Sequence, residues 1–287
     1  MLSGGSIEAL LAGSLLHWIM EDAPYGDYTS EAIGVGGEAE MRVKAKTGGI
    51  AACTGELAGA LRILGLDATP LVGSGSPFSP GDTLLRVRGD ARTLLLIERV
   101  TLDLLAYTAG IATATSKLVE AARRANPRIV VAATRKTVPG LRLCSKRAFR
   151  AGGGDPYRWG LSDALIVKDS HVELVGSLAE AVKKALRGKS FIHKLVVEVS
   201  KPEDALTAAR LGADVVMLDN MSVEEASEAL RLLEEAGLRG RVIVEVSGGI
   251  GPDNIVDYAS LGVDVVSTSY PFYRPERIDL SAEMVRP

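Results

Sequence analysis

Basic side chains gather in one part of this sequence, between residues 134 and 171. The whole chain carries a formal net charge of -3, so this clustering is a local feature. Arginine binds planar carboxylates and phosphates through paired hydrogen bonds, and lysine adds a compact positive charge. The segment therefore predicts a site for a small anionic ligand, with a solvated basic helix face as the alternative. Its basic residues are Arg135, Lys136, Arg142, Lys146, Arg147, Arg150, Arg158 and Lys168.

Two of these residues directly follow a predicted strand. Arg135 and Lys136 come after the apolar run 129–133, and barrel enzymes place their chemistry at the carboxyl ends of their strands. A solvated helix face does not explain that position. Gly152, Gly153 and Gly154, in the same segment, would let the backbone approach a ligand closely.

Carboxylates occupy similar positions farther along the chain. Glu198 and Asp219 lie within or just after two further apolar runs, and Glu245 lies inside a third. Such carboxylates can hold a divalent cation that bridges to a sugar or a pyrophosphate. Alternatively, one of them pairs with Lys168 or Lys136 across the mouth of a barrel, because either arrangement satisfies a charge near a buried site. The sequence leaves both interpretations open.

Small and hydroxylated residues follow the last two predicted strands. Ser247, Gly248 and Gly249 precede a helix, where free backbone N–H groups can bind a phosphate. Ser267 and Thr268, after the next strand, could supply hydroxyl groups to the same phosphate. A tight strand-to-helix turn is the alternative explanation of the glycines.

The remaining reactive residue types give weaker signals. His171 follows a strand, a position that is more often structural than catalytic. Cys144 lies near the basic segment without a matching His–Asp arrangement, so we expect no nucleophile there. Cys53 and Cys144 sit in unrelated contexts and show no metal-ligand spacing. We therefore expect no disulfide and a reducing, cytoplasmic environment.

The second half of the chain alternates between short apolar runs and helical segments, which predicts βα units around a parallel sheet. Continuous runs rich in Val and Ile are typical of strands covered on both faces. We expect a barrel or partial barrel, with an open doubly wound sheet as the alternative. The predicted strands are residues 129–133, 164–167, 195–199, 215–218, 242–246 and 263–267, and the predicted helices are 178–186, 202–211, 223–236 and 252–261.

The first third of the chain has a mixed pattern. Residues 7–20 predict an amphipathic helix with one buried face, and residues 38–47 alternate as a half-buried strand does. A polar turn is predicted at 26–30, a short helix at 56–64 and a second strand at 83–87. Residues 92–125 predict one or two long helices, with Gly110 as a break.

The composition is that of a soluble globular protein, with 47% hydrophobic and 24% charged residues. The apolar run 10–20 is too short to span a bilayer and lacks the flanks of a secretory signal. The mildly acidic net charge argues against a general nucleic-acid-binding surface. We therefore expect neither a nucleic acid nor a membrane as partner.

Several motifs, taken in order, resemble those of quinolinate phosphoribosyltransferases. Residues 134–142, TRKTVPGLR, are similar to a signature loop of that family, and so are the triple glycine 152–154 and the segment KDSH at 168–171. Residues 217–220 and 247–250 resemble two further family motifs, and residues 26–29, 98–100 and 110–113 resemble upstream ones. The resemblance spans nearly the whole chain.

The resemblance implies an α/β protein with an N-terminal α/β sandwich domain, residues 1–110, and an incomplete parallel α/β barrel, residues 111–272. Residues 273–287 would return to the N-terminal domain. It also implies a homodimer or higher homo-oligomer with shared active sites. The implied reaction joins quinolinate to phosphoribosyl pyrophosphate (PRPP) with Mg²⁺, giving nicotinate mononucleotide, pyrophosphate and CO₂ in NAD biosynthesis.

Residue roles follow from the same resemblance. Arg135 and Arg158 would bind the two carboxylates of quinolinate, and Arg99 would reach the same ligand from a partner subunit. Lys136 and Lys168 would face the substrate carboxylate and the PRPP phosphates. Glu198 and Asp219 would contact the ribose and the metal. Ser247, Gly248 and Gly249 would bind the 5′-phosphate. The remaining implied substrate contacts are Tyr157, His171, Ser267 and Thr268.

Several positions depart from the family pattern. Ser145 and Ser200 stand where glutamates are common, and residues 267–271 replace a small loop that contains glycine. Tyr157 stands where the family usually has a histidine, and residues 24–25 and 73–76 resemble a sister group linked to molybdenum transport. The alternative function is therefore a sister phosphoribosyltransferase that acts on another aromatic acid. A non-catalytic binding protein on the same scaffold is the third hypothesis, and the presence of Lys136, Lys168, Glu198 and Asp219 argues against it.

Overall fold

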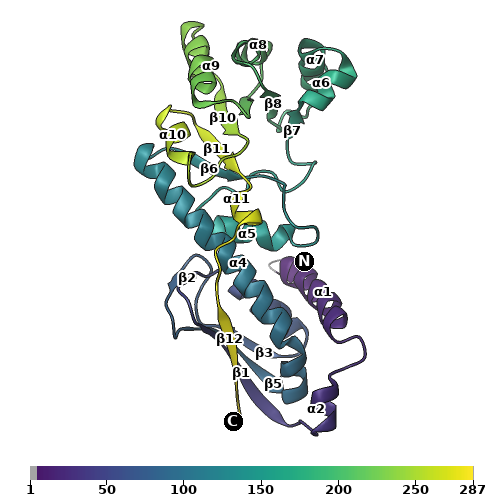
Figure 1. The fold of residues 1–287 in the computed structure, drawn as a ribbon. Coiled ribbons are helices and arrows are strands. Elements are labelled where there is room, and N and C mark those ends of the chain that lie inside the picture. The colour runs from purple at the N-terminus through teal and green to yellow at the C-terminus, as the bar shows by residue number, and fades with distance from the viewer. Residues whose placement is uncertain (1–4, 287) are drawn as a thin grey trace. The chain divides into compact units, whose positions relative to one another are not determined.

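The computed structural model describes residues 5–286 and divides into two compact units (Figure 1). Unit 1 comprises Met1–Ala114, Arg147–Gly153 and Arg274–Pro287, and unit 2 comprises Thr115–Lys146 and Gly154–Tyr273. The outermost residues of the predicted N-terminal domain, 1–4 and 287, lie outside the described part. The sequence placed the domain boundary at 110/111 and assigned residues 147–153 to the barrel, whereas the structure groups that segment with unit 1.

Unit 1 is built on an antiparallel sheet of four strands in the order β12-β1-β5-β3. Helices α1 (Gly5–Asp22) and α3 (Thr54–Ile63) pack against each other. In α1, Leu11, Ala12 and Leu15 are buried, so the predicted amphipathic helix is confirmed. The strands are β1 (Glu38–Ala45), β3 (Asp67–Pro70), β5 (Thr83–Asp90) and β12 (Leu280–Val285), and the short strands β2 (Gly49–Ile50) and β4 (Pro77–Phe78) pair separately.

Two predictions for this part of the chain were wrong. Helix α4 (Ala91–Ala125) is continuous, so Gly110 does not break it. Instead, a Cβ at this position would lie 2.4 Å from the carbonyl oxygen of Glu276, so the glycine allows a close approach of the C-terminal segment. The predicted polar turn contains the start of helix α2 (Tyr28–Ala32), because the Asp27 side chain accepts hydrogen bonds from Thr29 N and Ser30 N and caps that helix.

Unit 2 is built on a parallel sheet of six strands in the order β6-β11-β10-β9-β8-β7. The strands are β6 (Val130–Ala133), β7 (Leu165–Val167), β8 (Leu195–Val199), β9 (Val215–Asp219), β10 (Ile243–Ser247) and β11 (Val265–Thr268). Helices follow them along the chain: α5 (Arg142–Ala151, shared with unit 1), α6 (Asp169–Val175), α7 (Leu178–Gly188), α8 (Pro202–Leu211), α9 (Val223–Glu235), α10 (Ile255–Ser260) and α11 (Tyr270–Tyr273).

The sheet of unit 2 is an incomplete barrel. Strands β6 and β7 are its two edges and do not pair with each other in the described residues. On the β6 side, the chain segment before β7 continues the sheet, since Asp155 N donates to Val131 O and Ala133 N donates to Asp155 O. The predicted α/β fold with an N-terminal sheet domain and an incomplete parallel barrel is confirmed.

Two aspartates make equivalent hydrogen bonds at the residues that precede strands β9 and β11. Asp214 Oδ2 accepts hydrogen bonds from Leu195 N and Lys189 Nζ, each at 2.7 Å. Asp264 Oδ2 accepts from Val244 N at 2.8 Å and from Arg239 Nη1 at 2.9 Å. Each carboxylate therefore ties the start of its own strand to the preceding strand in the chain, which fixes the register at the amino end of the sheet.

None of the helices in residues 5–286 is long and apolar enough to cross a membrane.

Candidate active site

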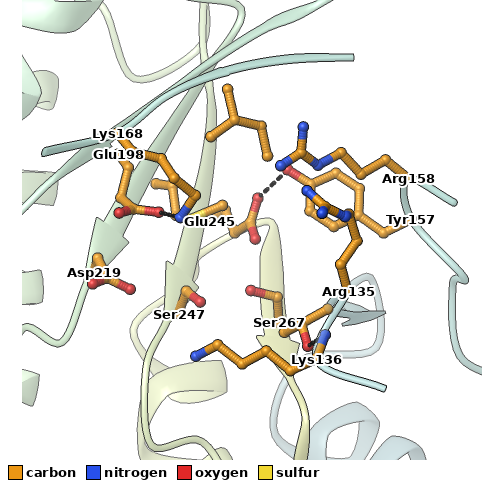
Figure 2. Close-up of a pocket in the computed structure, with 13 residues that line it drawn as sticks. Arg135, Lys136, Tyr157, Arg158, Lys168, Glu198, Asp219, Glu245, Ser247 and Ser267 are labelled. Carbon is orange, nitrogen blue, oxygen red and sulfur yellow. Dashed lines mark hydrogen bonds and ion pairs between the residues drawn. The ribbon is translucent and has the colours of Figure 1, made fainter. Parts of the chain in front are cut away.

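A cavity of about 290 Å³ opens at the carboxyl end of the unit 2 sheet (Figure 2). Strand register explains which side chains reach it. Asp219, Ser247 and Ser267 form one row across β9, β10 and β11, and Glu198, Met217 and Glu245 form a second row across β8, β9 and β10. The cavity is lined by Thr134, Arg135, Lys136, Tyr157, Arg158, Ile166, Lys168, Glu198, Met217, Asp219, Glu245, Ser247 and Ser267.

Two arginines form the cationic side of this cavity. In Figure 2, Arg135 and Arg158 lie beside Tyr157, on the opposite side of Glu245 from Lys168. Arg158 Nη1 donates to Ala164 O at 3.2 Å, whereas the buried Nε of Arg135 has no partner among the described residues. Burial and the neighbouring Arg135 lower the pKa of Arg158. Two close guanidinium groups with unused donors favour an anionic ligand that carries more than one charge.

A buried lysine holds the two loops that carry these arginines. Lys146 is 0% exposed, and its Nζ donates to Pro156 O and, at 3.5 Å, to Ala133 O. Burial, with Arg142 next, lowers the pKa of Lys146 to about 8. Because Ala133 and Pro156 each lie two residues before an arginine of the site, the ammonium group fixes the distance between Arg135 and Arg158.

The opposite side of the cavity contains an ion pair. Lys168 Nζ lies 2.5 Å from Glu198 Oε2, and the Glu198 side chain is only 10% exposed. The pairing that the sequence left open for one carboxylate is therefore present at Glu198. Asp219, on the next strand, accepts a hydrogen bond from Asn220 Nδ2 at 2.6 Å and has no basic partner among the described ion pairs.

The Ser247-Gly248-Gly249 turn has the geometry of a close backbone approach. Gly248 has φ +98°, and a Cβ on it would lie 2.3 Å from Asn220 Oδ1 and 2.8 Å from Asn220 N. Thr268 Oγ1 donates to Ile250 O at 2.6 Å and so holds the end of this turn. Only glycine fits at position 248, because the turn approaches Asn220 closely there with a positive φ.

Replacing Gly248 by alanine is expected to lower the free energy of unfolding by about 2–3 kcal/mol, because left-handed strain and a backbone clash add. Gly249 is the matched control, since it also has positive φ (+63°) but no atom lies within 4 Å of an added Cβ. Gly249→Ala should cost about 1 kcal/mol, the cost of the left-handed conformation alone. Chemical unfolding of both variants measures the difference, and equal losses would show that Asn220 gives way.

A buried carboxyl group lies at the centre of the cavity. Glu245 is 1% exposed, and Tyr157 Oη donates a hydrogen bond to its Oε2 at 3.0 Å. Its other oxygen, Oε1, and the nearby Ser267 Oγ have no partner among the described residues. Burial raises the pKa of Glu245 to about 7. Tyr157 adopts a left-handed backbone conformation, φ +54°, and Asp155 Oδ1 accepts a hydrogen bond from its N–H at 2.6 Å.

Replacing Glu245 by glutamine is expected to stabilise the protein at pH 8 and to change its stability little at pH 4. The raised pKa means that Glu245 loses its proton near pH 4.5 in the unfolded chain but only near pH 7 in the folded protein. Between these pH values the folded protein holds a proton that the unfolded chain has released. Stability of the wild type therefore falls across that window, by up to about 3 kcal/mol, and the neutral amide avoids the loss. Urea unfolding at several pH values tests this, and a constant difference between the two proteins would contradict it.

The structure brings together nine of the predicted site residues. They are Arg135, Lys136, Tyr157, Arg158, Lys168, Glu198, Asp219, Ser247 and Ser267. Gly248, Gly249 and Thr268 support the turn beside them. His171 Nδ1 accepts a hydrogen bond from Lys168 N at 3.0 Å, within the first turn of α6, and does not line the cavity. Arg99 belongs to unit 1, where it pairs with Asp103 at 3.2 Å.

Glu245 also lines the cavity; the sequence singled it out as a carboxylate similar to Glu198 and Asp219, but the family resemblance assigned it no role. The signal was a lone charge inside the apolar run Val242–Val246, where both faces of a parallel strand are covered. Ile166 and Met217 were missed for a different reason. They are apolar residues of the lining, and apolar residues within a strand carry no sequence signal that separates the inside of a barrel from the outside.

Family models match nearly the whole chain. Residues 27–109 match the N-terminal domain of quinolinate phosphoribosyl transferase, and residues 111–283 match its C-terminal domain. The chain belongs to the quinolinate phosphoribosyltransferase family. The predicted resemblance is thus confirmed, and the cavity described above lies within the part that matches the C-terminal domain of this family.

The chain is similar both to carboxylating nicotinate-nucleotide pyrophosphorylases and to a putative pyrophosphorylase, ModD. A probable nicotinate-nucleotide pyrophosphorylase (carboxylating) of Archaeoglobus fulgidus is 46% identical over 74% of this chain and 81% of its own. A putative pyrophosphorylase, ModD, of Rhodobacter capsulatus is 34% identical over 92% of this chain and 96% of its own. The crystal structure of NadC from Streptococcus pyogenes superposes with a TM-score of 0.85, at 34% identity, and covers 95% of both chains.

Proposed function

We propose that this enzyme transfers the phosphoribosyl group of PRPP to quinolinate with loss of CO₂, giving nicotinate mononucleotide and pyrophosphate for NAD biosynthesis. The observation that carries the proposal is the pair of guanidinium groups, Arg135 and Arg158, beside an ion pair and a glycine turn in one cavity of the family's catalytic domain. Similarity to carboxylating nicotinate-nucleotide pyrophosphorylases supports it.

Quinolinate carries two adjacent carboxylates on a pyridine ring. Arg135 Nε has no other partner, and planar guanidinium groups bind carboxylates with two parallel hydrogen bonds. With each arginine holding one carboxylate, the apolar side chains of Ile166 and Met217 in the lining could contact the ring. That placement orients the ring nitrogen, the nucleophile of the reaction, and orientation of two reactants lowers the barrier to their union.

Glycosyl transfer develops positive charge on the ribose as the bond to pyrophosphate breaks. Glu198 and Asp219 line the cavity on neighbouring strands, so their carboxylates can stabilise that charge. Lys168 holds Glu198 in place and offers its ammonium group to the departing phosphates. The new bond leaves the ring nitrogen positively charged, which makes the ring an electron sink for the carboxylate that leaves as CO₂.

Mg²⁺ fits this site when it arrives with PRPP. No group of three or more metal-ligating side chains occurs within residues 5–286, and Mg²⁺ is commonly bound through one or two carboxylates together with substrate phosphates. Asp219 is suited to that role because no basic side chain of residues 5–286 forms an ion pair with it, and Glu198 lies on the neighbouring strand. Bound there, the ion would neutralise charge on the departing pyrophosphate.

We further propose a cytoplasmic homodimer, or a higher homo-oligomer, in which Arg99 of one subunit completes the site of its partner. Membership of the family supports this assembly, and so does the exposure of Arg99. Its side chain is 61% exposed, and the ion pair that holds it among the described residues is an i,i+4 pair with Asp103, an interaction that contributes little. It is therefore available to bind an anionic ligand.

One observation favours a second candidate function, transfer to another aromatic acid. Tyr157 replaces the usual histidine and hydrogen-bonds to Glu245, and the chain is also similar to the putative pyrophosphorylase ModD. Tyrosine is neutral at physiological pH, so this wall of the cavity lacks a charge that the usual histidine can carry.

The deciding experiment mixes purified protein with PRPP, Mg²⁺ and quinolinate and follows nicotinate mononucleotide and pyrophosphate. We expect both products in equal amounts, and loss of turnover when Mg²⁺ is chelated. Bound PRPP without product would refute quinolinate as the substrate and favour the second candidate, which a panel of aromatic acids would then test.

A further inference from the structure

We infer that the aromatic acid binds together with one proton, which the carboxylate of Glu245 takes up from solvent. The inference rests on the proposed function. It concerns a residue to which that function assigns no role. The step forms one O–H bond on Glu245 and converts a buried carboxylate into a neutral carboxylic acid.

The first argument is the position of Glu245. It is a charged residue type that is 1% exposed, at the centre of a cavity, and none of the ion pairs of residues 5–286 includes it. Tyr157 donates a hydrogen bond to Oε2 from a neutral hydroxyl. Oε1 has no hydrogen-bond partner among the described residues, and the nearby Ser267, which also lowers the pKa of Glu245, is neutral as well. Burying a carboxylate without a cationic partner is costly, so protonation is the inexpensive way to satisfy it.

The second observation is the charge that a dicarboxylate brings into this cavity. Held by Arg135 and Arg158, the ligand would place two further negative charges beside Glu245, which lines the same enclosed space. Nearby like charges disfavour the ionised form of a carboxyl group. With Glu245 protonated this repulsion is absent, and the new O–H can donate to a ligand carboxylate or to Ser267.

The other polar groups around Glu245 do not provide an alternative site for the proton that is taken up. They are Tyr157 and Arg158 from the segment before β7, Lys168 after β7, Glu198 on β8, Ser267 on β11 and Arg135 after β6. Burial and Glu245 raise the pKa of Tyr157, which therefore stays neutral. Glu198 lies on β8, which does not pair with β10. Met217 on β9 pairs with both residues and so separates Glu198 from Glu245. The negative charge of Glu198 raises the pKa of Glu245 further.

Calorimetric titration with quinolinate in HEPES and in Tris tests the inference, because the two buffers release different heats when they give up a proton. At pH 8 we expect an uptake close to one proton per site in the wild type, and at pH 6 an uptake near zero. Glu245→Gln should bind quinolinate with no uptake at either pH. Glu234→Gln, an exposed glutamate on α9, is the matched control and should behave as the wild type does.

A second measurement is independent of the glutamine variant. The KM for quinolinate should be constant below pH 7 and rise about tenfold per pH unit above it, as binding of one proton requires. In Tyr157→Phe the rise should begin at higher pH, since the lost hydrogen bond lowers the pKa of Glu245 in the wild type.

Three results would overturn the inference. The first is a heat of quinolinate binding to the wild type at pH 8 that does not depend on the buffer. The second is a KM for quinolinate that does not change between pH 6 and 9. The third is a proton uptake that persists in Glu245→Gln, which would place the proton on another group, for example Lys146. If the wild type nevertheless forms nicotinate mononucleotide, only this inference fails. If quinolinate neither binds nor reacts, the proposed function fails with it.

Discussion

Arg135→Ala is expected to raise the KM for quinolinate by roughly 30- to 4,000-fold, which corresponds to the usual cost of about 2–5 kcal/mol for stranding the partner of a buried charge. The buried Nε of Arg135 has no partner among the described residues, so it is free to bind the ligand. Arg158 cannot replace it, because in the proposed complex Arg158 binds the other carboxylate. Initial rates at varied quinolinate and saturating PRPP measure the effect.

The control for Arg135 is another arginine of the same basic segment. Arg150 is exposed and does not line the cavity, so Arg150→Ala should leave the KM for quinolinate within about twofold, a change worth a few tenths of a kcal/mol. Equal effects of the two substitutions would mean that general positive charge attracts the substrate. An unchanged KM in Arg135→Ala would remove Arg135 from the site.

Lys168→Ala is expected to lower kcat by roughly 100- to 1,000-fold while changing the KM for PRPP less, because preorganised charges act mainly on the transition state. Two effects add. The departing phosphates lose an ammonium group, and Glu198, 10% exposed, loses its ion-pair partner at 2.5 Å. The freed carboxylate can then move away from the developing positive charge. Steady-state kinetics with each substrate in turn separate kcat from KM.

A double-mutant cycle distinguishes the two effects of Lys168. If the lysine acts only through Glu198, then Lys168→Ala in a Glu198→Gln background should cost nothing further. A remaining loss measures its direct contact with the phosphates. Lys183→Ala is the control, since Lys183 is exposed and lies 3.8 Å from Glu180. A larger effect on the KM for PRPP than on kcat would assign Lys168 to binding alone.

The strands of unit 2 could be predicted closely from the sequence. The run 195–199 coincides with β8, and the other five predicted strands differ from the observed ones by one or two residues at an end. Buried parallel strands leave a clear pattern, because both faces are apolar and a helix must follow each strand. The same logic placed Arg135, Lys168 and Asp219 at strand ends, and the structure brings them to one cavity.

One wrong prediction depended on a distant contact. Gly110 was predicted to break a helix, yet α4 is continuous through it, and the glycine allows the close approach of Glu276, far away in the sequence. The start of α2 was missed although its signal is local, because Asp27 caps the helix through Thr29 N and Ser30 N. His171 likewise makes a local contact, since its Nδ1 accepts the Lys168 N–H.

The sequence by itself determined the family, the alternation of strands and helices, and the ends of the strands at which the chemistry lies, because these depend on residue type and short-range spacing. Only the tertiary structure decided the register that places Glu245 beside Met217 and Ser247 beside Asp219. It also decided that Lys168 pairs with Glu198 and that Tyr157 binds Glu245. Each pair joins residues at least 28 positions apart. Parallel pairing of strands creates the first two pairs directly and brings the segments of the other two together, and sequence spacing alone does not specify that pairing.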